Sequence, residues 1–301
     1  MKDLVIIGGG PAAITAAIYA CRQNADFKVI SESVGGQAAL SFQIENYTGF
    51  QLISGAELIS RFMEHAEEFG IEIKDGFRVE KVEEKEDGFN VFTADGKCCS
   101  SRALIVASGA RPRRLGVPGE SEFSGRGVAY CATCDAPIFR GKDVAVIGGG
   151  NAALDAARQL KELAKRVFIV TINDKLEGEK ILKDRVTNSP NVEVLTAART
   201  MEIKGERTVN GIDVHKDGRT ETIGVEGVFV EIGWLPSSDF IDFVSKNDKG
   251  EIIVDIDNRT SREGVYAAGD VTSVSKKQII IASGAGASAA LNAIEYLSKK
   301  E

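Results

Sequence analysis

The sequence has 301 residues, of which 43% are hydrophobic and 27% are charged, and its net charge is −7. This length suits two domains, each large enough to bury a core. Nucleic-acid-binding proteins present a basic stripe, and this acidic chain has none, so nucleic acid is excluded as a partner. The composition is that of an ordinary globular α/β protein.

The first twenty residues superficially resemble a signal peptide, because Lys2 precedes an apolar run. Asp3 and the block Gly8-Gly9-Gly10-Pro11 interrupt that run, so we expect mature structure here. The later run Ile279–Ala290 is too short and too rich in Gly and Ser to be expected to span a bilayer. We therefore expect a cytoplasmic protein without a membrane partner.

One pattern occurs twice along the chain. Asp3 opens Asp-Leu-Val-Ile-Ile-Gly-Gly-Gly-Pro-Ala-Ala, and Asp143 opens Asp-Val-Ala-Val-Ile-Gly-Gly-Gly-Asn-Ala-Ala. Each copy is an apolar run, a Gly-x-Gly-x-x-Ala turn and a small-residue segment. This predicts a buried parallel strand, a tight turn and a helix held close to the sheet.

Each small residue of the turn has a separate purpose. The first glycine (Gly8 or Gly148) permits the turn, and the next (Gly10 or Gly150) lets a pyrophosphate approach the backbone. The alanines Ala13 and Ala153 keep the helix against the strand. We expect a dinucleotide at the first copy, whereas nucleotide binding at the second copy stays open.

The segment Phe27–Ser31 reads as the second strand of the first unit. Glu32 follows about 20 residues after the turn, where a carboxylate accepts ribose hydroxyls. The alternative is a solvated loop acid. The alternating runs within Val79–Phe92 predict an antiparallel pair, and Ala103–Val106 predicts another buried strand.

The second unit repeats this plan, with strands expected at Val167–Val170, Val192–Leu195 and Val225–Ile232. A last strand, Gly264–Ala268, ends at Asp270, and ligands of doubly wound sheets bind at the carboxyl ends of strands. Stiff crossovers at Arg111–Gly119 and from Leu235 separate the two units. The fold class is therefore α/β, with two doubly wound Rossmann-like domains: residues 1–113 and 242–301 form one, and residues 114–241 are inserted in it.

Five cysteines occur, and only Cys131 and Cys134 have a spacing with chemical meaning. At a helix start, the backbone amides lower a thiol pKa, and thiolate is the species that attacks a disulfide. Asp135 follows directly and can pass protons to a departing thiol. Zinc would need two further ligands at a matching spacing, and Cys98-Cys99, His65 and His215 do not supply them, so we expect no metal.

With these motifs in view, the chain resembles the low-molecular-weight thioredoxin reductases over essentially its whole length. Further shared segments are Gly35-Gly36-Gln37, Glu45-Asn46-Tyr47, Ile105–Pro112, Gly116–Glu120 and Ile232–Pro236. The segment Lys277–Gly284 is also similar to the flavoprotein subunit of alkyl hydroperoxide reductase.

The resemblance implies FAD as cofactor and a homodimer that reduces a thioredoxin-like protein. Cys134 would face the flavin, Cys131 would attack the partner disulfide, and Asp135 would be the acid–base group. The family usually has a small acidic residue between the last two glycines, whereas this chain has Ala285 there, between Gly284 and Gly286. The residues implied in FAD binding are Gly8, Gly10, Ala13, Glu32, Gln37, Asn46, Asp270 and Gln278.

The resemblance to the same family also predicts which molecule donates the electrons. NADPH-using relatives place His-Arg-Arg and a later Arg after the second strand of the inserted domain, and these arginines grip the 2′-phosphate. This chain has Thr171-Ile172-Asn173 and Glu177 there, and an anion repels a phosphate. The ribose-binding acid of NADH users, expected at Thr171, is also missing. The chain thus resembles the ferredoxin-dependent branch: reduced ferredoxin is the expected donor, ahead of NADH and then NADPH.

Two other functions share part of these features. Ferredoxin–NADP oxidoreductases use the same scaffold but lack the Cys-x-x-Cys segment. A flavin-binding sensor would keep the cysteines yet reduce no disulfide protein.

Overall fold

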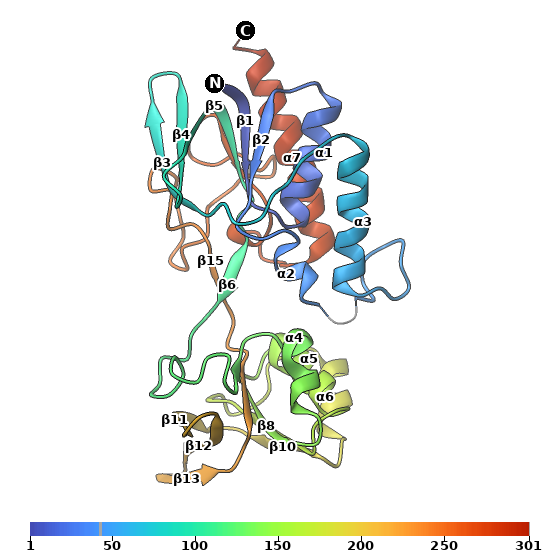
Figure 1. Ribbon diagram of the computed structural model, residues 1–301, viewed down its shortest axis with the longest axis vertical. Coiled ribbons are helices and arrows are strands. Elements are labelled where there is room, and N and C mark those ends of the chain that lie inside the picture. Colours follow the sequence, from blue (N-terminus) through green and yellow to red (C-terminus); the bar gives the residue numbers. More distant parts are fainter. Residues whose placement is uncertain (42–43, 301) are drawn as a thin grey trace. The chain divides into compact units, whose positions relative to one another are not determined.

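The computed structural model describes residues 1–41 and 44–300, except for the side chains of Thr133 and Cys134. It divides into two compact units (Figure 1). The terminal unit comprises Met1–Arg111 and Leu235–Glu301, and the inserted unit comprises Pro112–Trp234. One unit is thus built from both ends of the chain.

The terminal unit is organised around one mixed sheet. Its parallel strands are β1 (Lys2–Ile7), β2 (Phe27–Ile30), β5 (Cys98–Val106) and β16 (Val265–Ala267). The hairpin β3 (Val79–Lys85) and β4 (Gly88–Thr93) extends β5 on its other side, giving the order β2-β1-β5-β4-β3 with β16 also on β5. The antiparallel pair expected within Val79–Phe92 is confirmed.

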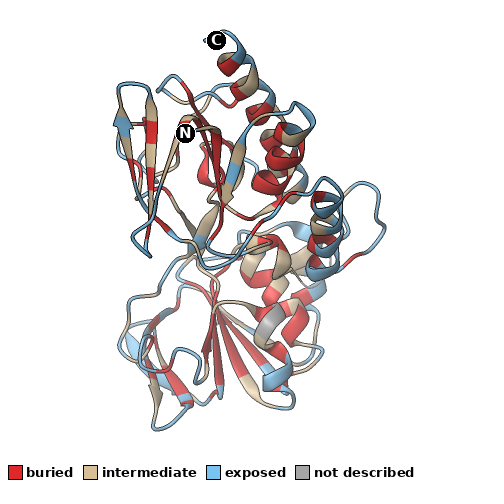
Figure 2. Cartoon of the chain, turned by 45° about the horizontal axis from the view of Figure 1, so that its top comes forward, coloured by how far each residue is buried: buried red, intermediate tan, exposed pale blue. Residues whose placement is uncertain are grey.

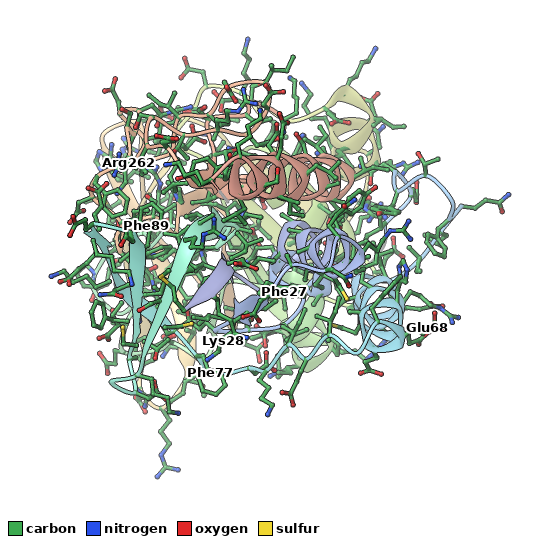
Figure 3. All side chains as sticks on the ribbon, turned by 90° about the horizontal axis from the view of Figure 1, so that it is seen from above. Phe27, Lys28, Glu68, Phe77, Phe89 and Arg262 are labelled. Carbon is green, nitrogen blue, oxygen red and sulfur yellow. The ribbon has the colours of Figure 1, made fainter. Side chains whose placement is uncertain are left out.

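Helices cover one face of this sheet. They are α1 (Pro11–Arg22), α3 (Gly55–Glu68) and α7 (Ile279–Ser298), with two short turns, α2 (Gly36–Ala39) and η2 (Gly269–Val271). Figure 3 shows α1 and α7 side by side, and alanines on both helices are buried in one cluster with Leu4 and Ile6 of β1. Small side chains bring the two helices close because little volume separates their backbones.

The opposite face of the sheet packs on loops near the C-terminus. Phe89 of β4 stacks on Phe243 with ring centroids 5.9 Å apart, and Arg262 pairs with Glu84 at 2.6 Å; Phe89 and Arg262 are labelled in Figure 3. Both faces of the parallel strands are therefore buried, as Figure 2 shows. This explains why β1 and β5 contain the continuous apolar runs Leu4–Ile7 and Ala103–Val106 instead of an alternating pattern.

The inserted unit has a parallel sheet in the order β10-β9-β8-β14-β7. Its strands are β7 (Val128–Ala129), β8 (Asp143–Ile147), β9 (Arg166–Val170), β10 (Val192–Leu195) and β14 (Gly227–Val230). The helical segments are α4 (Ala132–Asp135), η1 (Ala136–Phe139), α5 (Asn151–Leu160) and α6 (Lys180–Thr187). The predicted α/β class, with two dinucleotide-binding folds and one inserted in the other, is confirmed.

A three-stranded antiparallel sheet in the inserted unit was not predicted. It consists of β11 (Arg199–Gly205), β12 (Val209–Lys216) and β13 (Arg219–Ile223). Its outer face is polar, so the strands lack the continuous apolar runs of the parallel sheet. Alternate side chains such as Ile203, Ile212 and Val214 are buried against that sheet, which is the period-2 pattern that marks such strands.

The two crossings between the units, β6 (Ala110–Pro112) and β15 (Trp234–Pro236), pair with each other. The two units meet after Arg111 and after Trp234, two and seven residues before the boundaries expected at 113/114 and 241/242. Residues after Trp234 bond to the terminal unit: Ser237 N donates to Gly109 O at 2.9 Å, and Val82 N donates to Phe240 O at 2.8 Å. Sequence composition does not reveal such backbone bonds.

The helix α7 is longer than the apolar run that predicted it. Over Ile279–Ser298 it is long and apolar enough to cross a membrane by length and composition alone, which is weak evidence. Ile279–Ala290, the run expected to be too short to span a bilayer, forms the first part of this helix. One third of its most apolar window is buried inside the structure, where Ala289, Ala290 and Ala293 pack in the core with α1.

Candidate functional site

The first glycine turn connects β1 to α1. Gly8 has φ of +135°, and a Cβ on it would lie 2.1 Å from the carbonyl oxygen of Ala107 at the end of β5, so only glycine fits. Gly10 is the N-cap of α1, and a Cβ there would meet nothing closer than Gly35 O at 4.0 Å. The space beside Gly10 is thus open, which lets a pyrophosphate approach the backbone at the start of α1.

Two residues follow β2 beside this turn. Ser31 is 1% exposed, and its hydroxyl, which lies against Gly9, has no hydrogen-bond partner in the described structure. Glu32 is exposed at the carboxyl end of β2, as predicted, and its carbonyl accepts from Gly76 N at 3.1 Å. Ser31 was missed from the sequence; an unpaired buried hydroxyl is costly, so we read it as a group that awaits a ligand.

The remaining predicted residues come from distant parts of the chain. Asn46 Nδ2 donates to Gln278 Oε1 at 2.9 Å, although 232 positions separate them. Gln37 Nε2 donates to Ala110 O at 3.4 Å. Asp270 lies in η2 directly after β16, and its burial raises the pKa of its carboxyl group while Lys277 lowers it.

The side chain of Lys277 contacts both η2 and Glu251. Its ammonium pairs with Glu251 at 2.9 Å and donates to the carbonyl oxygens of Asp270, at 3.3 Å, and Thr272. Gln278, the next residue, is the N-cap of α7. The ends of β1, β2 and β16 and the starts of α1 and α7 carry most of the predicted set, while Gln37 lies in α2 and Asn46 in the loop after it. The open turn, the Ser31 hydroxyl without a partner among the described residues and the buried carboxyl of Asp270 fit a dinucleotide cofactor.

The second turn has the same backbone but different surroundings. Gly148 has φ of +140° and would clash with Glu231 O at 2.1 Å if it carried a Cβ. The loop after β9 folds onto the turn: Glu177 N donates to Gly149 O at 2.8 Å, as Gly35 N does to Gly9 O at 2.7 Å in the first turn.

A closer contact distinguishes the second turn from the first. Glu179 N donates to Asn151 Oδ1 at 2.7 Å, and Asn151 Nδ2 donates to the Glu179 carboxylate at 3.3 Å. A Cβ on Gly178 would lie 3.3 Å from Asn151 N, at the start of α5. The helix start that would receive a pyrophosphate thus already has a carboxylate of the chain beside it.

The strand register locates the ribose position in both units. Ile7 pairs with Ile30, and Ile147 pairs with Val170, so Ser31 corresponds to Thr171 and Glu32 to Ile172. Thr171, where a ribose-binding acid was sought, is 4% exposed and lies against Gly149. The counterpart of Glu32 is Ile172, which is 64% exposed. Neither position offers a carboxylate or a cation.

The cysteine segment lies between β7 and α4. Cys131 is disulfide-bonded, whereas Cys21, Cys98 and Cys99 are free. Asp135 N donates to Cys131 O at 3.1 Å, which closes the first turn of α4. The backbone of Cys134 belongs to α4, but its side chain lies outside the described side chains.

Two carboxyl groups of the inserted unit have displaced pKa values. Burial raises the pKa of Asp135, which favours its protonated form. Burial, helped by the charge of Asp155, raises the pKa of Glu231 to about 8. Glu231 follows β14 and was missed from the sequence, because its burial depends on the packing of α5 against the sheet.

Comparison with known proteins extends this picture. A family model described as pyridine nucleotide-disulphide oxidoreductase matches residues 2–291. The chain is 38% identical to an alkyl hydroperoxide reductase subunit of Staphylococcus aureus, covering 98% of this chain and 59% of that protein. It is 40% identical to a protein named NADH dehydrogenase of Bacillus subtilis, covering 98% and 58%. The chain thus spans about three fifths of the length of these relatives.

Solved structures match over the whole length. Thioredoxin reductase of Lactococcus lactis is 33% identical with a TM-score of 0.94, covering 99% of this chain and 100% of that one. A ferredoxin-flavin thioredoxin reductase of Clostridium acetobutylicum is 32% identical with a TM-score of 0.55, covering 99% and 98%. The chain belongs to the pyridine nucleotide-disulphide oxidoreductase family.

Proposed function

We propose that this protein reduces a disulfide of a thioredoxin-like protein through a disulfide between Cys131 and Cys134. The observation that carries the proposal is the redox state of the cysteines: Cys131, at the start of α4, is disulfide-bonded, while Cys21, Cys98 and Cys99 are free. A two-residue spacing at a helix start favours thiol–disulfide exchange over a structural role.

The residues have separate tasks in this reaction. FAD, when bound, supplies the two electrons that break the sulfur–sulfur bond; two protons complete the pair of thiols. The residues that we propose to hold it are Gly8, Gly10, Ala13, Ser31, Glu32, Gln37, Asn46, Asp270 and Gln278. Asp135, whose pKa is raised by burial, holds a proton next to the cysteines. The Cys131 thiolate then attacks the partner disulfide, breaks its sulfur–sulfur bond and releases one partner thiol. Cys134, which faces the flavin, attacks the resulting mixed disulfide, which releases the second partner thiol and restores the disulfide between Cys131 and Cys134.

We assign reduced ferredoxin as the electron donor. The ribose position of the inserted unit carries Ile172, Glu177 is an anion where NADPH users have a cation, and Glu179 lies at the start of α5. A solved relative of similar length is a ferredoxin-flavin thioredoxin reductase. NADH is the second candidate donor, because one relative is named an NADH dehydrogenase.

The cysteine relay is tested by single substitutions. We expect Cys131→Ser and Cys134→Ser each to abolish reduction of a thioredoxin-like protein while FAD stays bound, measured by turnover and visible absorbance. Only Cys131→Ser, which keeps the flavin-facing thiol, is expected to show long-wavelength absorption. Turnover in either variant would refute a two-cysteine relay. Cys98→Ser is the control and should retain full turnover.

The donor is tested by anaerobic stopped-flow measurement of flavin bleaching with ferredoxin, NADH and NADPH. A charge pair near a protein surface is worth on the order of 4 kcal/mol before desolvation, so lost cations slow NADPH strongly. We expect ferredoxin to reduce the flavin at least about tenfold faster than micromolar NADPH. Ile172→Arg combined with Glu177→Arg should accelerate NADPH and leave the ferredoxin rate unchanged. Equal rates in the unaltered protein would restore the NADPH-dependent assignment.

We also propose a homodimer in the cytoplasm. The free thiols of Cys21, Cys98 and Cys99 suit a reducing compartment. Sedimentation equilibrium of the yellow protein tests the dimer: a mass near the 32.2 kDa of one chain would contradict it.

A further inference from the structure

Three side chains form a hydrogen-bonded network directly before the redox cysteines. The hydroxyl of Tyr130, the residue preceding Cys131, donates to Glu120 Oε1 at 2.7 Å. The guanidinium of Arg114 donates to the same hydroxyl, and its central carbon lies 4.3 Å from the centre of the Tyr130 ring. We call this set the Tyr130 clamp: Arg114, Glu120 and Tyr130.

Glu120 is the most firmly held residue of the Tyr130 clamp. It is 2% exposed, and besides the Tyr130 hydroxyl its carboxylate accepts from Leu115 N at 2.8 Å and Gly116 N at 2.6 Å. The loop that it closes is anchored in turn, because Ile203 N of β11 donates to Pro118 O at 2.9 Å. A buried carboxylate with three donors resists displacement, since losing one donor leaves a charge poorly satisfied.

The backbone around Cys131 is held from both faces of the sheet. Ala129 and Ala132 are buried in the cluster that contains Phe139 and Phe229, whereas Tyr130 packs with Val128 in the cluster on the other face. Cys131 is thus flanked by residues that cannot shift independently. The pKa of Tyr130 is raised to about 12 by burial and by Glu120, so its hydroxyl remains a donor.

We propose that Tyr130 is a positioning residue for the redox disulfide: its bond to buried Glu120, supported by Arg114, holds the backbone of Cys131 in the geometry that favours the closed disulfide. The network is formed while Cys131 is disulfide-bonded, and on this proposal its release shifts the equilibrium toward the dithiol. The inference rests on the proposed function only in taking Cys131 as part of the redox centre.

The test compares Tyr130→Phe with the unaltered holoenzyme in glutathione redox buffers. In this equilibrium two glutathione thiols are oxidised to one glutathione disulfide, while the protein disulfide takes up the two electrons and two protons. Thiol labelling and mass spectrometry of the peptide containing Cys131 give the dithiol fraction. We expect Tyr130→Phe to shift the equilibrium at least about threefold toward the dithiol, which corresponds to about 14 mV for a two-electron couple.

A matched control separates positioning from general stability. Tyr266→Phe also removes a hydroxyl that donates a hydrogen bond, in this case to the backbone carbonyl of Asn292 at 3.0 Å in the terminal unit. We expect it to lower the melting temperature as much as Tyr130→Phe does, without moving the redox equilibrium. If Tyr130→Phe does not yield folded yellow protein, the same redox equilibrium is measured with Glu120→Gln, which keeps the shape of the side chain, and the same shift toward the dithiol is expected.

An unchanged equilibrium in the folded clamp variants would overturn the proposal, as would an equal shift in Tyr266→Phe. Glutathione equilibrates with the cysteines without flavin turnover. Failure of the proposed function would therefore appear separately, as a normal redox equilibrium in a protein that never passes electrons to a thioredoxin-like partner.

Discussion

Burial raises the pKa of two carboxyl groups, those of Asp135 and Glu231, with different consequences for each. The cause in both is that a charge loses hydration in the protein. Asp135 lies next to the cysteines, where a retained proton is useful. Glu231 lies behind the second glycine turn beside the charge of Asp155, where a proton mainly avoids repulsion.

Replacing Asp135 by Asn should slow disulfide exchange, because the amide cannot donate a proton to the departing thiol. Loss of a general acid costs typically about a hundredfold or more in rate. The measurement is the rate of partner reduction as a function of pH. The rate of the unaltered enzyme should fall as pH rises through the raised pKa of Asp135, and the variant should lose that dependence. Asp184→Asn, on the exposed face of α6, is the control, and an identical profile for Asp135→Asn would exclude the acid role.

Glu231 makes stability depend on pH. Its folded pKa of about 8 lies above the ordinary value of 4.5, so the folded protein binds more protons than the unfolded chain between these values. Its contribution to stability is fully present below pH 4.5 and is lost as pH rises toward 8. We expect Glu231→Gln to match the unaltered protein at low pH and to exceed its free energy of unfolding above the folded pKa, by up to a few kcal/mol.

Urea unfolding at several pH values measures this difference. Glu162→Gln is the control, because that side chain is 73% exposed and should give no pH-dependent gain. A constant difference between Glu231→Gln and the unaltered protein across the range would contradict the assignment.

At the scale of elements, the two glycine turns have the same backbone path but different side chains beside the helix start. Both begin with a left-handed glycine that contacts the end of a neighbouring strand. The difference lies in the loops that follow the second strands: Gly35 and Gly36 bring no side chain to the first turn, whereas Glu179 bonds to Asn151 at the start of α5. A shared motif therefore does not imply a shared ligand.

The contact of α7 with α1 gives a prediction for one glycine. A Cβ on Gly286 would lie 2.1 Å from the carbonyl oxygen of Ala12, so Gly286→Ala must push the helices apart. We expect a loss of about 1–3 kcal/mol in the free energy of unfolding and weaker FAD retention on dialysis, since Ala12 belongs to the turn.

Gly284→Ala is the matched control for this contact. No atom lies within 4 Å of a Cβ at Gly284, so the higher helix propensity of alanine should stabilise α7 by up to about 1 kcal/mol. Thermal unfolding of Gly286→Ala and Gly284→Ala measures both changes in stability. Equal changes would show that the close contact of Gly286 with Ala12 does not determine the stability.

At the scale of the whole molecule, the inserted unit has the features of an independent domain. Its ends meet, because Arg113 N donates to Gly233 O at 2.9 Å, and it has core clusters on both faces of its parallel sheet. Chain termini that lie together allow a domain to be inserted or excised without threading.

We therefore expect a fragment of residues 112–234 to fold alone. Circular dichroism should show native helix and strand content, and urea should unfold the fragment in one cooperative transition. Its Cys131 disulfide should form in a glutathione buffer. A fragment without cooperative unfolding would show that the inserted unit depends on the rest of the chain.

The sequence alone determined the features that depend on short-range order. The apolar runs and glycine turns at Gly8 and Gly148 predicted two strand–turn–helix units, because each residue type there is required by its own backbone conformation. The spacing of Cys131 and Cys134 predicted the redox site in the same way. Only the tertiary structure decided how distant residues meet: it paired Asn46 with Gln278, left the Ser31 hydroxyl without a partner among the described residues and raised the pKa of Glu231 by burial. It also moved the second boundary to Leu235 and placed Glu179 at α5, because these depend on loop bonds and on the packing of elements, which no local pattern encodes.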